Sequence, residues 1–168
     1  EASFRVQEMA TATLQPGSCE RRTLLHIDVR RGSVGALVVS VPADANVLDV
    51  GTVTGADSKA AAVEDWSFSA RDERGLVRIV LSDDLSGAAT LYLVSERAPG
   101  SSTGEFTLEP FTVQGAGRQT GHIRAAVPSS FRLMEAESRN LQRRETGEAL
   151  PAWVSDEPAI PADGNVAL

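Results

Sequence analysis

The string GSSTG at residues 100–104 is the pattern in this chain that comes nearest to a catalytic motif. It matches G-x-S-x-G, in which a serine nucleophile stands on a tight turn between a strand and a helix. Here Pro99 interrupts the preceding strand, and the residues after Gly104 alternate in polarity like another strand. A flexible Gly/Ser loop is the favoured interpretation, and a serine hydrolase acting through Ser102 is the remote alternative.

Glycines at positions 115, 117 and 121 form a second pattern, which faintly matches a dinucleotide-binding loop. Such a loop needs a different last spacing and a βαβ unit around it. Residues 105–114 and 119–127 instead read as a pair of strands. We therefore interpret the glycines as a hairpin turn with positive φ angles or a bulge, and no cofactor-binding residue is predicted.

Histidines are common ligands of transition metals, and the chain has two, His26 and His122. A zinc site needs three or four ligands at short local spacing, which neither histidine has. Both fall on the polar parity of predicted strands, so solvated strand positions are the favoured interpretation. A meeting of the two histidines across facing sheets is left open.

Calcium prefers oxygen ligands, and three short groups in the chain could supply them. The groups are Asp44 with Asn46, Asp83 with Asp84, and Asp163 with Asn165. These residue types also favour turns, because their side chains form local hydrogen bonds with the backbone. No complete calcium-loop motif is present, so no metal site is predicted.

Cys19 is the only cysteine, so an internal disulfide is excluded and the redox compartment is left open. A reactive thiol needs a neighbouring base or cation that lowers its pKa. No histidine is adjacent to Cys19 in the sequence, and an inert thiol is the favoured interpretation. The sequence thus predicts no catalytic, cofactor-binding or metal-binding residue.

Composition bounds the class of protein. The 168 residues are 42% hydrophobic and 23% charged, which is typical of a globular chain that buries a real core. The net charge of −7 disfavours nucleic acid and anionic membrane surfaces as partners, because both attract basic patches. No apolar run approaches the ~18 residues that a membrane span needs.

Alternating apolar residues predict roughly nine short strands separated by turns. The expected strands are 3–14, 23–30, 36–41, 47–54, 65–70, 76–82, 88–96, 105–114 and 119–127. This rhythm predicts an all-β fold, an antiparallel β-sandwich of the Ig-like type. Residues 131–145 fit either a helix or a strand followed by a polar turn, and we favour the strand.

A repeated layout supports that preference. Residues 37–50 and 123–136 each contain an apolar strand that ends in Val-Pro, a polar turn and a second strand, at an offset of 86 residues. At nearly the same offset Trp66 falls opposite Trp153. Similarity at a fixed period indicates an array of modules, and two unrelated corners are the alternative.

The repeat predicts how the chain is divided. A β-sandwich module is expected at 21–105, and an incomplete second module packed on it at 106–150. Residues 1–20 are expected to form a strand that is able to pair with the second module, and 151–168 a proline-rich extended tail. The predicted core consists of inward-facing apolar residues: Leu25, Ile27, Val29, Leu37, Val39, Val41, Trp66, Phe68, Ile79, Leu81, Leu91, Leu93, Phe106, Leu108, Ile123 and Val127.

The strand rhythm and the Val-Pro corner, which extend over most of the chain, resemble the tandem β-sandwich regions of large bacterial envelope proteins. The resemblance implies a non-catalytic structural or protein-interaction module of a larger bacterial extracytoplasmic protein, periplasmic or at the cell surface. Its partners would be other domains of the same protein or another protein, engaged by addition of a β-strand.

A module that binds a glycan or a peptide is the alternative. Glycan recognition uses exposed aromatic side chains, and only 5% of this chain is aromatic. Trp66 and Phe68 are expected in the core. That expectation leaves Tyr92 and Trp153 as the exposed candidates.

Overall fold

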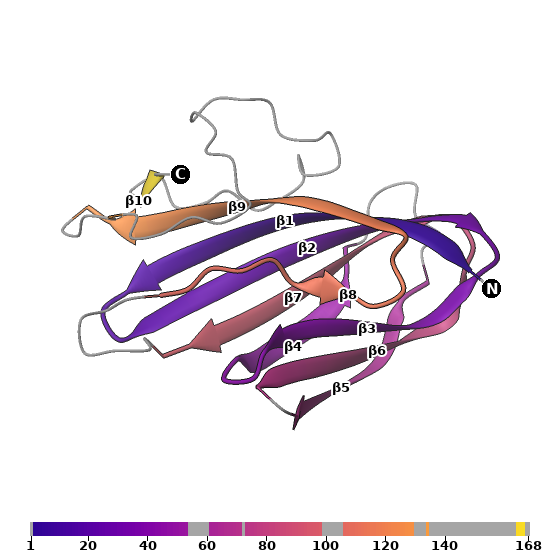
Figure 1. Cartoon of the computed structure of the whole chain (residues 1–168), viewed down its shortest axis with the longest axis horizontal. Coiled ribbons are helices and arrows are strands. Elements are labelled where there is room, and N and C mark those ends of the chain that lie inside the picture. Colours follow the sequence, from indigo (N-terminus) through magenta and orange to yellow (C-terminus); the bar gives the residue numbers. More distant parts are fainter. Residues whose placement is uncertain are drawn as a thin grey trace.

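The computed structural model describes residues 2–53, 61–71, 73–98, 106–129, 134 and 164–166. Within these ranges the chain forms ten strands and no helix (Figure 1). The strands are β1 (Ser3–Gln15), β2 (Ser18–Arg31), β3 (Val34–Pro42), β4 (Asn46–Thr52), β5 (Val63–Arg71), β6 (Arg74–Leu85), β7 (Ala88–Arg97), β8 (Thr112–Val113), β9 (Arg118–Pro128) and β10 (Gly164–Val166). Along β2, β6 and β7, buried side chains alternate with more exposed ones, as the sequence pattern predicts.

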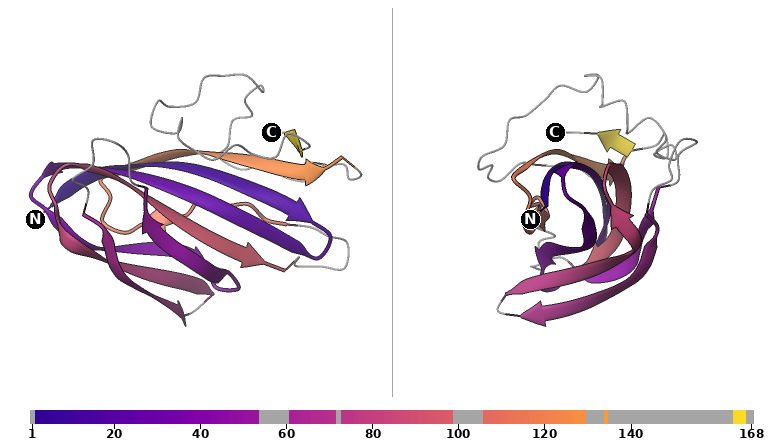
Figure 2. Two further views of the ribbon diagram at one scale, coloured as in Figure 1. Left: turned by 180° about the vertical axis from the view of Figure 1, so that it is seen from behind. Right: turned by 90° about the vertical axis from the view of Figure 1, so that its right-hand side faces the viewer.

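The strands form two sheets that face each other as a sandwich (Figure 2). One sheet has six strands in the order β10-β9-β1-β2-β7-β4, and the other has four in the order β5-β6-β3-β8. The predicted all-β sandwich is confirmed. One pairing differs from the antiparallel expectation, because β9 runs parallel to β1, with Arg5 facing Arg118 and Thr13 facing Ala126.

Apolar side chains from both sheets fill the space between them. The main core cluster contains these predicted core residues, which are confirmed as buried: Leu25, Ile27, Val29, Leu37, Val39, Val41, Ile79, Leu81, Leu91 and Leu93. Val127 is buried in a smaller second cluster with Ala12, Leu14, Cys19 and Ala125. Removal of this apolar surface from water is the main favourable term in folding.

Five predicted core residues are less buried than expected. Phe68 is 36% exposed, and Trp66, Phe106, Leu108 and Ile123 are half-buried. Phe68 and Trp66 stand on β5, an edge strand, and Ile123 stands on β9, next to the three-residue strand β10. Alternation shows which side chains point inward but not which strand lies at an edge, so these errors fall mainly on marginal strands.

The predicted strand at 105–114 is wrong for most of its length. Residues 106–111 form no strand, and β8 contains only residues 112–113. The predicted pairing with the next strand is also wrong, because β8 pairs with β3 whereas β9 pairs with β1. Pro110 has no N–H for a ladder, and side chains of the six-stranded sheet bind backbone groups of this segment instead.

The two Val-Pro corners end strands in different sheets. Val41-Pro42 ends β3 in the four-stranded sheet, and Val127-Pro128 ends β9 in the six-stranded sheet. The duplication stays a prediction. The strand predicted at 131–136 lies, apart from residue 134, outside the described residues, and of the predicted tail only β10 is described, paired with β9.

Because Ile79 is more buried than Phe68, we expect its replacement by alanine to lower the free energy of unfolding more. Ile79→Ala is expected to lower the free energy of unfolding by about 2–5 kcal/mol, because a fully buried side chain leaves a cavity. Phe68→Ala is expected to cost about 1 kcal/mol, because part of its ring already contacts water. Urea denaturation of both variants measures the difference, and equal costs would contradict the edge position of β5.

Candidate functional site

The first candidate site is the free edge of β5, at the lower margin of the molecule in Figure 1. β5 pairs with β6, and no described strand pairs with its other side. At its start, the Val63 N–H donates to Thr52 Oγ1 at 3.0 Å, which ties β5 to the end of β4. None of the β5 residues is buried. An open edge offers unpaired N–H and C=O groups, which suits strand addition.

Two aromatic side chains lie on the inner face of this edge strand. Trp66 packs against the main core cluster, whereas Phe68 is one of the exposed large hydrophobic residues. The Phe68 ring lies close to Gly75 of β6, where an added Cβ would come within 2.5 Å of the ring. Glycine at this position therefore lets the ring lie along its own sheet, with part of its surface open to solvent.

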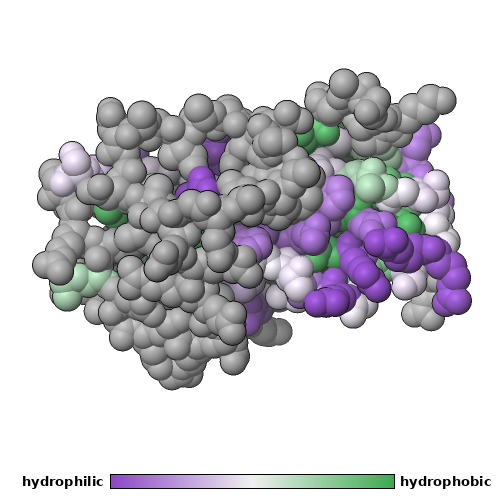
Figure 3. Space-filling model, turned by 90° about the horizontal axis from the view of Figure 1, so that it is seen from above, coloured by the Kyte–Doolittle hydropathy of each residue, from purple (hydrophilic) through white to green (hydrophobic). Residues whose placement is uncertain are grey.

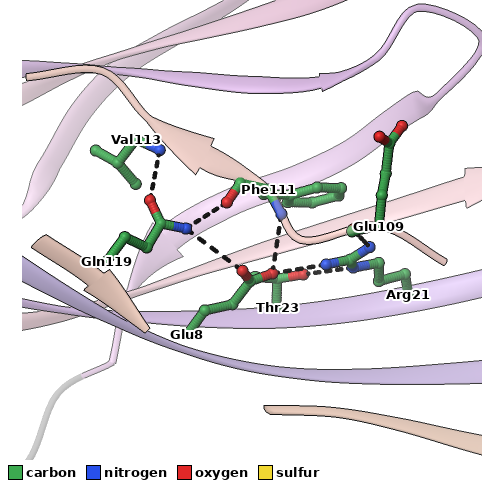
Figure 4. A network of polar contacts seen from close by, with 7 residues as sticks. All are labelled: Glu8, Arg21, Thr23, Glu109, Phe111, Val113 and Gln119. Carbon is green, nitrogen blue, oxygen red and sulfur yellow. Dashed lines mark hydrogen bonds and ion pairs between the residues drawn. The ribbon is translucent and has the colours of Figure 1, made fainter. Parts of the chain in front are cut away.

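The second candidate site is a buried polar cluster on the inner face of the six-stranded sheet (Figure 4). It consists of the side chains of Glu8, Arg21, Thr23 and Gln119, which we call the Glu8 cluster. Arg21 Nη2 donates to Glu8 Oε1 at 2.6 Å, and Arg21 Nε donates to Thr23 Oγ1 at 3.1 Å. Gln119 Nε2 donates to Glu8 Oε2 at 3.5 Å. The Glu8 side chain is 2% exposed and that of Arg21 is 7% exposed.

Backbone groups of residues 109–113 are the other partners of the Glu8 cluster. Arg21 Nη1 donates to the carbonyl oxygen of Glu109, and the Phe111 N–H donates to Glu8 Oε1 at 3.3 Å. The Arg21 guanidinium also lies 3.8 Å from the centroid of the Phe111 ring, a cation–π contact. These contacts hold the non-strand segment against the sheet.

Gln119 extends the cluster to the second sheet. Its Oε1 accepts a hydrogen bond from the Val113 N–H at 2.9 Å, and its Nε2 donates to the carbonyl oxygen of Phe111. Because Val113 belongs to β8 and Gln119 to β9, the cluster fastens the two sheets together. Gly121 allows the close approach of β9, since a Cβ there would lie 2.8 Å from the backbone oxygen of Glu8.

Burial acts against both charges of the central ion pair. It raises the pKa of Glu8, although the charge of Arg21 and the hydrogen bonds from Phe111 and Gln119 oppose the change. It also lowers the pKa of Arg21, although Glu8 opposes that change. A buried pair of this kind adds little net stability, but separating its partners is strongly unfavourable.

Cys19 lies beside a cavity of about 20 Å³ that Arg21, Arg97 and Leu108 also line. Burial raises the pKa of the Cys19 thiol, although the charges of Arg21 and Arg97 oppose the change. The cavity has room for a water molecule but not for a substrate. A protonated, enclosed thiol favours the inert interpretation.

The two histidines lie on the outer face of the same sheet. His26 on β2 faces Gln7, and His122 on β9 faces Met9, so β1 separates them. They do not meet across facing sheets. His26 is half-buried with its Nδ1 3.0 Å from Thr90 Oγ1, and burial lowers its pKa.

Two of the acidic residues considered as calcium ligands accept hydrogen bonds from other side chains of the same chain. Asp44 Oδ2 accepts a hydrogen bond from Arg97 Nη2, and Asp84 Oδ2 accepts one from Ser33 Oγ, both at 2.9 Å. Among the described residues, no three His, Cys, Asp or Glu side chains gather as a metal site requires. Asp163 lies outside the described residues.

The glycine pattern marks a connection between sheets. Gly115 has a φ of 81°, the positive value that the sequence predicts. The Gly117 N–H donates to the Phe4 carbonyl oxygen at 3.0 Å, which fixes the start of β9 beside β1. Ser102 of the G-x-S-x-G string lies outside the described residues.

Hydrophilic side chains prevail over the described surface that is seen from the β9 side (Figure 3). Tyr92, one of the aromatic residues predicted to be exposed, is half-buried and lies over Gly51. Its hydroxyl donates to Asp49 Oδ2 at 3.0 Å, and this bond raises the pKa of Tyr92. A ring held on its own sheet in this way is a poor platform for a sugar. Trp153 lies outside the described residues.

The Glu8 cluster was not predicted, although charged residues at inward-facing positions of two consecutive strands indicate it. Glu8 is the one charged residue on the otherwise apolar parity of 3–14. Arg21 stands on the same parity as Leu25 and Ile27, although it precedes the predicted strand. An acid and a base that replace apolar residues on the inward faces of consecutive strands predict a buried ion pair.

No protein-family model and no curated protein matches the sequence. Solved structures similar to the chain include an M1 zinc metallopeptidase from Deinococcus radiodurans, at 13% identity over 77% of this chain and 33% of that chain, with a TM-score of 0.45. A mutant of that class bound to the substrate Tyr-Ser-Ala gives a TM-score of 0.49, at 14% identity over 75% of this chain and 33% of that chain. The chain thus spans about a third of these metallopeptidase chains.

A non-cellulosomal cohesin from the archaeon Archaeoglobus fulgidus is also similar, at 17% identity over 74% of this chain and 91% of that chain, with a TM-score of 0.40. All three TM-scores lie below 0.5, so these similarities carry no argument about function. Within the described residues, no helix has the length and apolar character that crossing a membrane requires.

Because Glu8 and Arg21 form a buried ion pair, we expect the effects of replacing each of them on the free energy of unfolding to be non-additive. Glu8→Leu and Arg21→Met are each expected to cost about 3–5 kcal/mol of unfolding free energy, because each leaves an uncompensated buried charge. The double variant is expected to be more stable than either single variant, because it leaves neither charge. Urea denaturation completes the cycle, and a double variant that costs the sum of the single effects would contradict the coupling.

We expect the protonation of His26 to contribute to the loss of folding stability at acidic pH. Its folded-state pKa is lowered by burial, with Asp28 opposing, so protonation favours the unfolded chain. The stability that neutral His26 contributes is present above the ordinary histidine pKa of about 6.5 and is lost as the pH falls through the lower folded-state pKa. Chemical denaturation at a series of pH values should therefore show a smaller loss on acidification in His26→Gln. An identical loss in both proteins would exclude His26 as its source.

Proposed function

We propose that this chain is a non-catalytic structural or protein-interaction module of a larger bacterial extracytoplasmic protein. The observation that carries the proposal is the free edge of β5, a strand in which no residue is buried and whose outer side pairs with no described strand. A partner would add an extended segment to this edge through backbone hydrogen bonds, with side-chain contacts that provide specificity.

The rest of the fold suits such a role. The main core cluster and the Glu8 cluster connect the two sheets, so β5 is presented on a packed support. The net charge of −7 favours a protein partner over nucleic acid. The assignment to a larger extracytoplasmic protein rests on the resemblance to tandem β-sandwich regions of bacterial envelope proteins.

Glycan binding is the second candidate function, and the exposure of Phe68 favours it. Trp66 and Phe68 stand two residues apart on the same face of an edge strand, and neither is fully buried. Aromatic rings at an accessible edge can stack on sugar rings. A glycan would therefore contact the same strand as a peptide, and the two candidates differ in ligand.

Site-specific cross-linking tests the proposed function. A photoreactive phenylalanine derivative placed at Ser69, on the β5 edge, is expected to form one defined product in cells that express the parent protein. Peptide mapping should locate the attachment in an extended segment of that protein or of another one. The matched control places the same group at Ser86, an exposed turn residue outside the edge, and should give no such product.

Other outcomes would contradict the proposal. In a Trp153→Phe variant, Trp66 is the only indole, and saturable quenching of its fluorescence by a soluble polysaccharide would favour a glycan-binding module. Ester hydrolysis that Ser102→Ala abolishes would identify a hydrolase instead.

A further inference from the structure

The residues of β5 form a pattern that is complementary to itself. Acidic residues stand at the start of the strand, Phe68 stands near its middle, and Arg71 stands at its end. We propose that two copies of this chain pair through antiparallel β5 strands centred on Phe68, with Asp65 of each copy facing Arg71 of the other. This inference rests on the proposed function and names the partner as a second copy of the chain.

The backbone of β5 is free for such a pairing at alternate residues. Arg71 faces Arg74 across the two-residue turn to β6, and the register continues without a break to Trp66 opposite Ile79. The pair that flanks a two-residue turn is hydrogen-bonded, and hydrogen-bonded pairs alternate along an antiparallel ladder. Trp66, Phe68 and Ala70 therefore direct their N–H and C=O groups away from β6, toward the open side.

A register centred on Phe68 uses these groups. It places Phe68 opposite Phe68 and Trp66 opposite Ala70 of the other copy, so the free backbone groups face one another directly. The new pairs on the inner face are aromatic or apolar, and such cross-strand pairs stabilise a sheet. The two four-stranded sheets then form one continuous sheet, which removes the open edge from both copies.

The outer face of β5 supplies the charge complementarity. The same register places Asp65 opposite Arg71 twice, once on each side of the two-fold axis, with serines between them. Asp65 and Arg71 are exposed, and neither forms an ion pair with a described residue, so both are available to a second copy. A two-fold axis requires a self-complementary surface, and this strand has one.

Neighbouring registers lack this match. Centring the pair on Ser67 places Asp65 opposite Ser69 and Arg71 opposite Val63, so no opposite charges meet. Within β5, centring it on Ser69 places Arg71 opposite Ser67, so again no opposite charges meet. Charges on edge strands commonly prevent association, but here their order along β5 favours one antiparallel register.

Sedimentation velocity on the full chain tests the proposal. Between about 1 and about 300 µM, we expect a reversible monomer–dimer equilibrium, because an interface of a few strand residues is small and weak. Asp65→Arg and Arg71→Asp should each weaken dimerisation about tenfold or more, since each variant places like charges opposite one another twice. Arg31→Asp, which reverses an exposed charge at the end of β2 in the six-stranded sheet, is the matched control and should leave the dimer within about twofold of the wild type.

A mixture of the two variants gives the decisive measurement. Asp65→Arg in one copy and Arg71→Asp in the other restore both opposite-charge pairs, so an equimolar mixture should dimerise about as tightly as the wild type. Recovery in the mixture also shows that both variants fold. A monomer at every concentration, equal dimerisation of all variants, or a mixture that stays as weak as its components would overturn the proposal.

The two proposals can fail separately. A chain that remains monomeric but still cross-links to another protein through position 69 keeps the proposed function and removes the second copy as occupant of the edge. Loss of both signals removes both proposals.

Discussion

The buried ion pair between Glu8 and Arg21, which joins β1 to β2, is the centre of the cluster that fixes how the chain crosses between the two sheets. Apolar burial is non-directional, so it drives the sheets together without fixing how the segment at 106–111 crosses between them. The Glu8 cluster fixes that path, because its donors and acceptors match backbone groups of residues 109–113. A different path would leave the buried pair without these backbone hydrogen bonds, and each buried polar group left unsatisfied costs about 1–3 kcal/mol.

The margin of the sandwich at β8 and β9 is covered by side-chain contacts, whereas the margin at β5 is open. On the side of β8 and β9, side chains from the six-stranded sheet occupy backbone groups of the crossing segment. On the side of β5, the described structure provides no such cover, and an aromatic residue stays partly in solvent. Edge strands are usually covered or made unattractive to other strands, so this difference supports the β5 edge as the proposed contact surface.

Much of the fold follows from the sequence, because alternation of apolar residues reports strand direction and burial locally. Ile79 and Leu93 were therefore predicted correctly as core residues. Strand order is a non-local property, so the pattern wrongly predicts Phe68 in the core and a pairing of residues 105–114 with 119–127. The inward parity of Glu8 and Arg21 indicates their ion pair, but the contact of Glu8 with Gln119, 111 residues away, is not revealed by the spacing of single residues.

The parallel pairing of β1 with β9 has a consequence for how the chain reaches its native state. β1 and β2 are joined by a turn at Pro16-Gly17 and can associate early, since closing a short loop costs little entropy. β9 can pair with β1 only after most of the intervening chain has folded. This sheet is therefore completed through contacts between residues far apart in the sequence. Such topologies fold slowly, and until β9 arrives the flank of β1 is open to pairing with the wrong strand.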